Sequence, residues 1–234
     1  MAWFDLGRTV AGWQDYAVAL SERGKQIVLG SSIEDEAKDQ AYAADLEQGR
    51  GEDFRDLDEL GFSKLERVNE GQWLWLIFGR RLPMQVLDKE RVWRFMQVQM
   101  DEVDGHASVV YVHHGATYHD NCPGLAWMGA KLKGAPASVL EKVRRVLVLH
   151  PCAHLWSATQ LLGTSLLHSL WPKTVFVMRI ESLWEHLDRG VVSVALPSEV
   201  EEHDAYLEAN PLSDFYIAGS SLATQQTGAE EGSA

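Results

Sequence analysis

Five short apolar runs recur in the central part of the chain, at residues 73–78, 109–112, 146–149, 174–178 and 191–195. The second and third runs are apolar throughout instead of alternating with polar residues, which is typical of strands buried on both faces of a sheet. The segments between the runs favour helices. Because strands and helices alternate, the pattern predicts an α/β fold: a largely parallel sheet with right-handed crossovers, flanked by helices.

Side-chain spacing predicts where these helices begin. Asp88 is the expected N-cap of a helix that continues to about residue 103, since apolar residues recur on one face of it. Pro123 leads a second helix and Pro136 a third. A long apolar helix is predicted at about residues 153–170, and a short one at residues 181–187.

The two ends of the chain differ from this centre. Residues 1–66 show helical spacing near their start and a polar, acidic helix candidate at residues 32–46, so they are predicted to form an acidic helical extension. Residues 67–212 form the predicted α/β domain. Residues 213–234 are rich in Gly, Ser, Ala and Gln and are predicted to be disordered.

Charge is distributed unevenly along the chain. The net charge of −13 is the sum of −8 over residues 1–66 (7 Lys/Arg, 15 Asp/Glu), +3 over residues 67–196 (14 and 11) and −8 over residues 197–234 (0 and 8). Such acidic flanks disfavour nucleic acid as a partner. Arg144, Arg145 and Lys173, in the mildly basic centre, are candidates for holding a phosphate.

The sequence also bears on the compartment. No apolar run approaches the roughly 20 residues that a membrane span needs, and the N-terminus lacks a basic region followed by an apolar one. Cys122 and Cys152 are expected to be reduced thiols at the edge of the core. These features predict a cytoplasmic protein with at most peripheral membrane contact.

The histidines raise the question of a metal site. His106, His113, His114, His119 and Cys122 fall within seventeen residues. However, His113 and His114 are adjacent, so on a strand they point to opposite faces and cannot both ligate one ion. We therefore expect no metal here, and one of the two histidines to pack under the sheet edge.

Motifs of covalent and cofactor-dependent catalysis are absent: there is no G-x-S-x-G, P-loop, H-E-x-x-H or G-x-G-x-x-G. A Cys–His pair is formally possible, because His119 is near Cys122 and His154 near Cys152, but nothing in the sequence orients either base. We expect no enzymatic activity and no cofactor.

The predicted helix at 153–170 is the main functional candidate. It is apolar around much of its circumference and carries no Asp, Glu, Lys or Arg over almost five turns. Such a helix is either an ordinary buried crossover or faces an apolar ligand. Gly163, at its middle, costs about 1 kcal/mol relative to alanine. Either a moving gate or a close helix contact explains this glycine.

Several segments together resemble the divergent CRAL-TRIO family and, within it, the BCH-type domains of certain Rho GTPase-activating proteins. The resemblance covers about residues 72–210. Val148–Pro151 match a further segment of the family. From the chemistry of proline, we interpret His150 and Pro151 as the end of a strand, with His150 restricted to an extended backbone. The matching segments are Phe78–Pro83, Glu181–Leu187 and Leu196–Val200 with Asp204; the other matching positions are His113, His114, Gly115, Asn121, Cys122, Pro123, Trp127 and Lys173.

The resemblance implies a non-enzymatic module that binds a lipid or a lipid-modified protein in a helix-walled cavity. The alternative is an interaction scaffold that binds a small Rho-type GTPase or a second copy of itself, with the cavity filled by side chains. No GTPase-activating domain is expected in this chain. Under the lipid-binding hypothesis, the gate helix and cavity residues are Leu155, Trp156, Leu162, Gly163, Leu166, Leu170 and Trp171.

Overall fold

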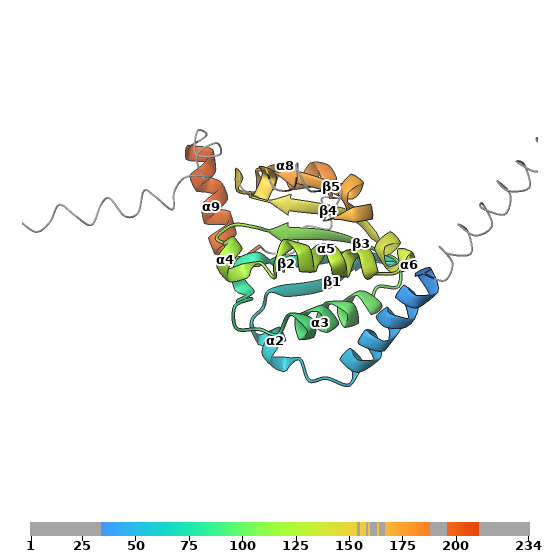
Figure 1. Ribbon diagram of the computed structural model, residues 1–234. Coiled ribbons are helices and arrows are strands. Elements are labelled where there is room, and N and C mark those ends of the chain that lie inside the picture. The colour runs from blue at the N-terminus through green and yellow to red at the C-terminus, as the bar shows by residue number, and fades with distance from the viewer. Residues whose placement is uncertain are drawn as a thin grey trace, which may run out of the picture.

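The computed structural model describes residues 34–153, 155–157, 159, 163, 167–187 and 196–210. Its centre is a five-stranded sheet in the order β1-β2-β3-β4-β5 (Figure 1). β1 is antiparallel to β2, and the other neighbours are parallel, which confirms the predicted α/β fold. The strands are β1 (Ser63–Asn69), β2 (Gln72–Phe78), β3 (His106–Val112), β4 (Val143–Leu149) and β5 (Thr174–Val177).

Four of the five predicted strands are confirmed, and β1 is an addition. The predicted strand at residues 191–195 lies outside the described residues. β1 contradicts the prediction of helices up to residue 66, and the predicted domain boundary at 66/67 falls inside this strand. β1 was missed because it is an edge strand with charged residues at Lys64, Glu66 and Arg67, which is how sheet edges are usually protected.

The helices lie close to their predicted positions. Asp88 caps α3 as predicted, since its side chain accepts a hydrogen bond from the backbone N–H of Glu90 at 2.9 Å. The end of the predicted 153–170 helix is wrong: residues 168–173, which include Pro172, form the 3₁₀ helix η2. The remaining helices are residues 34–50, α2 (Arg55–Glu59), η1 (Gly79–Arg81), α3 (Lys89–Asp101), α4 (Tyr118–Asn121), α5 (Leu125–Gly134), α6 (Ala137–Lys142), a helical segment that begins at residue 153, η2 (His168–Lys173), α8 (Ile180–His186) and α9 (Ser198–Ala209).

Strand order determines which helices cover each face of the sheet. From β2 to β5 every new strand is added on the same side of the last, so right-handed crossovers place all the connecting helices on one face. We call this the crossover face. Its core contains Trp75 and Val109 of the sheet packed with Met100 of α3, Leu132 of α5 and Leu170 of η2.

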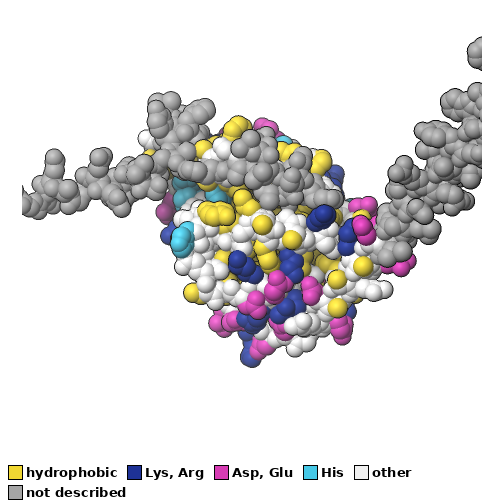
Figure 2. Space-filling model, in the orientation of Figure 1, with side chains coloured by type: hydrophobic (Ala, Val, Ile, Leu, Met, Phe, Trp, Pro, Cys, Tyr) yellow, Lys and Arg dark blue, Asp and Glu magenta, His cyan; other side chains and the backbone are white. Residues whose placement is uncertain are grey.

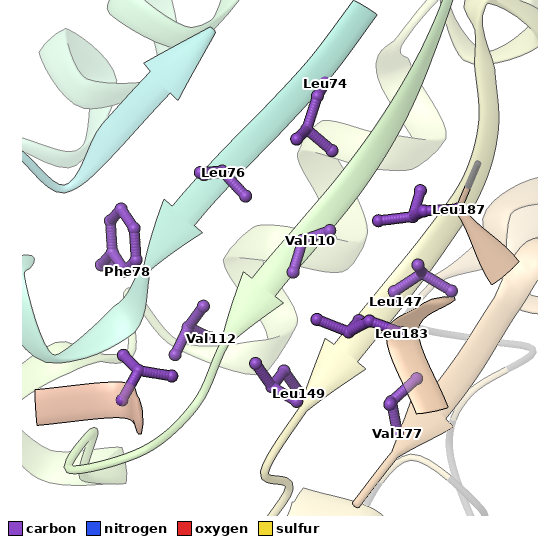
Figure 3. Close-up of a cluster of buried hydrophobic side chains, with 11 residues drawn as sticks. Leu74, Leu76, Phe78, Val110, Val112, Leu147, Leu149, Val177, Leu183 and Leu187 are labelled. Atoms are coloured by element: carbon purple, nitrogen blue, oxygen red, sulfur yellow. The ribbon is translucent and has the colours of Figure 1, made fainter. Parts of the chain in front are cut away.

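The opposite face is covered by α8 and α9. Leu147 and Val177 of the sheet pack there with Leu183 of α8 and with Leu187, which follows α8 (Figure 3). Val200 of α9 belongs to the same cluster. All of these side chains are buried. The side chains on this face are the most completely buried part of the core.

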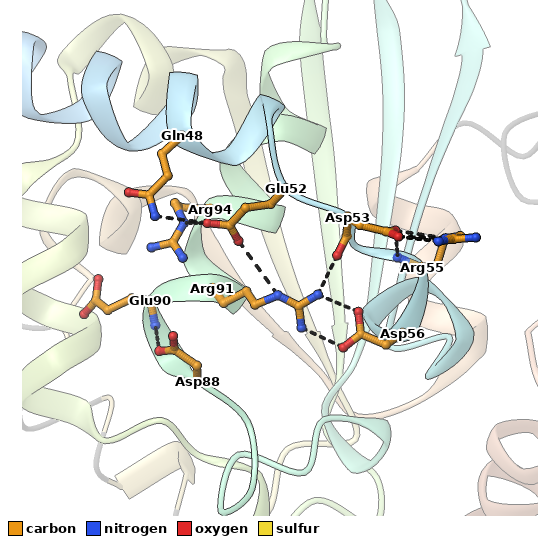
Figure 4. Close-up of polar contacts among 9 residues, drawn as sticks. All are labelled: Gln48, Glu52, Asp53, Arg55, Asp56, Asp88, Glu90, Arg91 and Arg94. Atoms are coloured by element: carbon orange, nitrogen blue, oxygen red, sulfur yellow. Dashed lines mark hydrogen bonds and ion pairs between the residues drawn. The ribbon is translucent and has the colours of Figure 1, made fainter.

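Two arginines of α3 form ion pairs with acidic residues of the segment that precedes β1. Arg91 donates to both carboxylate oxygens of Asp56 at 2.6 Å, and Arg94 donates to Glu52 at 2.7 Å (Figure 4). Beside these ion pairs, the fully buried Phe62 packs its ring on Phe95 of α3. Residues 54–62 therefore contribute to the packed core.

Candidate ligand-binding face

A row of partly buried side chains crosses the sheet near the carboxyl ends of its strands. The parallel register aligns Ile77, Tyr111, Val148 and Phe176 across β2, β3, β4 and β5, on the crossover face. Ile77, Tyr111 and Phe176 are only partly buried, although they lie inside a helix-covered sheet. Val148, between Tyr111 and Phe176, is buried at 7% exposed. We call Ile77, Tyr111 and Phe176 the half-buried row.

The adjacent row on the opposite face is sealed. Phe78, Val112, Leu149 and Val177 are 6%, 2%, 0% and 2% exposed. The two rows lie at the same end of the sheet, so the difference is not an effect of distance from the edge. The crossover face is therefore the more loosely covered of the two at this end.

Helix α5 contributes to this loose cover. It runs back from the carboxyl edge, where β3 ends, to the edge where β4 begins, so its first half lies over the carboxyl half of the sheet (Figure 1). It is apolar, yet none of its residues is fully buried; Leu125, Met128 and Leu132 are all partly buried. Tightly packed helices normally bury their inward side chains completely. Hydrophobic side chains are also visible across the middle of this face in Figure 2.

Two of the predicted gate residues, Leu170 and Trp171, contact the crossover face. Leu170 packs in the crossover-face core and Leu155 is partly buried, whereas Trp156 is 50% exposed. Thr159 is buried and its hydroxyl donates to the carbonyl of Leu155 at 2.7 Å, so the helix satisfies its own polar group. Leu162 and Leu166 lie outside the described residues.

Gly163 is explained by a close contact with Trp171. A Cβ built at position 163 would be 2.4 Å from Cε3 of Trp171, so the indole would have to move. Of the two explanations that the sequence left open, this geometry favours close contact. The indole of Trp171 therefore connects η2 to the helical segment, and its ring also lies 6.5 Å from that of Phe176 in the half-buried row.

Replacing Gly163 with alanine is expected to displace the indole of Trp171 and to lower the free energy of unfolding by about 1–3 kcal/mol. Gly134→Ala is the matched control, because Gly134 is also helical but its added Cβ meets nothing within 4 Å. We expect this control to be neutral or slightly stabilising. Denaturant unfolding of both variants measures the difference, and equal effects would contradict the contact.

His113 forms a polar cluster at the end of the half-buried row. Its Nε2 lies 3.1 Å from Sγ of Cys152, and its Nδ1 lies 3.4 Å from the hydroxyl of Tyr111. Burial, and secondarily His114, lowers the pKa of His113 from its usual 6.5 to about 4. The sequence suggested His154 as the neighbour of Cys152, but the structure places His113 there; His154 lies outside the described residues.

A second histidine cluster holds α9 against the carboxyl edge. The ring of His114 stacks on that of His203 of α9 at 3.7 Å, and His150 Nε2 lies 2.8 Å from Oδ1 of Asp204. The same oxygen accepts a hydrogen bond from the backbone N–H of Ile180 at 2.8 Å. Burial is the main cause of the lowered pKa of both His114 and His203, and His203 falls to about 4.

The backbone at His150 corrects a prediction. His150 ends β4 as expected, but its φ of 51° is in the left-handed region and not extended. Its backbone N–H donates to the carbonyl of Val177 at 3.0 Å, and its side chain contacts Asp204. These tertiary contacts override the local preference of a residue that precedes proline.

The other histidines of the metal hypothesis do not gather at this edge. His106 begins β3 at the opposite end of the strand, and His119 on α4 contacts Gln85 and Asp120. Within the described ranges, no group of three His, Cys, Asp or Glu side chains has a geometry that could hold a metal ion.

The predicted phosphate ligands are separated in the structure. Lys173 donates to the carbonyls of Leu140 and Val143 at 3.0 and 2.8 Å, so its ammonium connects η2 to the start of β4. Arg144 and Arg145 line a hollow of about 430 Å³ at the amino ends of the strands, away from the half-buried row. Lys173 therefore shares no site with these arginines.

Several family-motif residues have structural roles. Trp127 donates from Nε1 to Glu90 at 2.8 Å and meets Trp93 edge to face, which fixes α5 on α3. Gly115 has a φ of 71°, a conformation that favours glycine. Asn121 donates to the carbonyl of Leu82 at 3.0 Å, Pro123 precedes α5, and Pro151 is buried next to His150.

The described chain is thus a five-stranded α/β sheet whose two apolar faces are unequally covered at the carboxyl end. The chain belongs to the divergent CRAL/TRIO domain family, whose model matches residues 74–205, more than half of its length. Domains of this family are generally ligand-binding transfer modules and not enzymes. A comparison with curated proteins gives no match. No helix in the described part of the chain has the length and apolar character to cross a membrane.

Proposed function

We propose that this chain binds a lipid, or the lipid group of a modified protein, on the crossover face. The observation that carries the proposal is the unequal burial of the two rows at the carboxyl end of the sheet. The half-buried row and the inner side of α5 offer apolar surface that the chain itself covers only in part. Family membership supports the same function.

The hydrophobic effect is sufficient to drive such binding. Each methylene group that leaves water contributes about 0.8 kcal/mol. A chain with about ten buried methylenes thus gains about 8 kcal/mol, which corresponds to a micromolar dissociation constant when the ordering costs are offset by other contacts. The free energy of burying a single acyl or prenyl chain is therefore large enough to drive its binding.

Native mass spectrometry of the purified protein, combined with organic extraction, tests the proposal. We expect a stoichiometric lipid to co-purify, or to be acquired from vesicles of mixed phospholipids and fatty acids. Met128→Asp places a charge on the partly buried side of α5 and should weaken loading at least tenfold. Ala130→Asp, on the exposed side, is the matched control.

Thermal melting of both variants separates lost binding from lost folding. A wild-type protein that stays free of lipid after incubation with these vesicles would contradict the proposal. In that case, the interaction scaffold is the better account. Its capture of a small Rho-type GTPase, or of a second copy, would then be measured directly with purified components.

The finer assignments are part of this proposal. A BCH-type domain, a cytoplasmic location and peripheral membrane contact are all consistent with a carrier of lipid or of a lipid-modified GTPase. Of the gate residues, Leu155, Trp156, Gly163, Leu170 and Trp171 are proposed to border the ligand. The same role is proposed for Leu162 and Leu166, which are neighbours of Gly163 in the sequence.

A further inference from the structure

Three side chains from different parts of the sequence meet at the end of the half-buried row. Tyr111 belongs to β3, His113 follows that strand, and Cys152 precedes the helical segment after β4. The imidazole of His113 lies between the other two, 3.1 Å from the thiol and 3.4 Å from the phenol. His113 is 9% exposed, whereas Cys152 is partly exposed. Cys152 is thus the more exposed residue of the pair, and its neighbouring base is largely buried.

The backbone around Cys152 helps to hold its thiol in place beside His113. Sγ accepts a hydrogen bond from the backbone N–H of Leu155 at 3.3 Å, in the first turn of the helical segment. Cys122, the other cysteine, has no hydrogen bond to a histidine among the described residues, and it provides an internal control.

The position of His113 is fixed on two sides. Its backbone N–H donates to the carbonyl of Leu149 at 3.0 Å, which ties it to β4, and its ring contacts Tyr111. A nucleophile in contact with a base, and a third group that orients the base, form the usual geometry of an activated thiol. Burial lowers the pKa of His113 to about 4, so its imidazole is neutral at pH 7, and the proposed proton transfer rests on the contact of its Nε2 with Sγ at 3.1 Å.

The neighbouring apolar surface indicates the class of substrate. Tyr111 contacts His113 and is also a member of the half-buried row, so the thiol is next to the surface on which we place a hydrocarbon chain. We propose that Cys152 is a nucleophile that accepts a long-chain acyl group from an acyl thioester. The location of the chain rests on the function proposed above, whereas the reactivity of the thiol does not.

The reaction balances without a further reactant. Sγ of Cys152 attacks the thioester carbonyl carbon while its proton passes to Nε2 of His113. The bond between that carbon and the leaving sulfur then breaks, and the leaving thiolate takes the proton from His113. The products are S-acylated Cys152 and a free thiol, with no change in oxidation state.

Intact-mass measurement of the full chain after incubation with palmitoyl-coenzyme A tests the proposal. We expect one acyl group per chain, removed by hydroxylamine, and peptide mapping that assigns it to Cys152. Cys152→Ser should abolish the adduct and Cys122→Ser should retain it. His113→Gln should slow acylation at least tenfold, while thermal melting confirms that the variants fold.

A parallel reaction with acetyl-coenzyme A distinguishes failure of this proposal from failure of the lipid-binding proposal. If the thiol is reactive but no chain binds, Cys152 reacts with both thioesters at the same rate. If both proposals hold, the long-chain thioester reacts at least tenfold faster. Acylation at Cys122, or a rate at Cys152 no higher than that of free cysteine, would overturn the assignment.

Discussion

Replacing Asp204 with alanine is expected to lower the free energy of unfolding by about 3 kcal/mol. One oxygen of this carboxylate contacts His150 Nε2 and the backbone N–H of Ile180, each at 2.8 Å, so it connects α9 to the ends of β4 and β5. The side chain of His150 is completely buried, and the substitution removes this polar partner from it. Denaturant unfolding at pH 7 measures the loss.

Glu202→Ala is the matched control for this variant. Glu202 is an exposed acidic residue two positions earlier on α9, and surface substitutions of this kind usually change stability by no more than about 0.5 kcal/mol. If the two variants were equally stable, Asp204 would not be what holds α9 on the sheet. Hydrogen exchange should show faster exchange in α9 of Asp204→Ala only.

Acidification is expected to destabilise the protein between about pH 6.5 and pH 4. The folded protein holds the pKa of His113 at about 4 through burial, whereas the unfolded chain has the usual 6.5. Between these values the unfolded state binds more protons, so stability falls as the pH is lowered. At 1.36 kcal/mol per unit, this one residue accounts for about 3 kcal/mol. His203, whose pKa is also lowered, acts in the same direction.

Variants at two histidines test the origin of this pH dependence. His113→Gln should make the stability profile flatter between pH 6.5 and 4.5, because it removes the group that gains a proton on unfolding. His106→Gln, at an exposed position, should leave the profile unchanged. A profile of His113→Gln that matches the wild type would show that the proton uptake belongs to other groups.

The sequence predicted the parts of the fold whose signals are local. The runs in β2, β3, β4 and β5 are uniformly apolar because both faces of a parallel sheet are covered, and that signal does not depend on the partner strands. Asp88 was recognisable as a cap from its neighbours alone. β1 was not recognisable from the sequence, because an edge strand with several charged residues has the composition of a solvated helix.

The polar cluster depends on contacts between distant segments. His113 and Cys152 follow neighbouring strands, so their proximity could have been inferred only once β3 and β4 were known to be adjacent. The stack of His114 on His203 could not have been inferred, because it depends on how α9 returns across the carboxyl edge. Likewise, Gly163 has a clear role only beside Trp171.

Photo-crosslinking would show whether an apolar ligand lies on the crossover face. A palmitic acid that carries a diazirine in its chain would be bound, irradiated and mapped by peptide sequencing. If the ligand lies on this face, we expect labels on α5 and on the half-buried row, at or near Met128, Tyr111 and Phe176. Labels confined to exposed residues such as Tyr118 and Tyr206, or no saturable labelling, would contradict it.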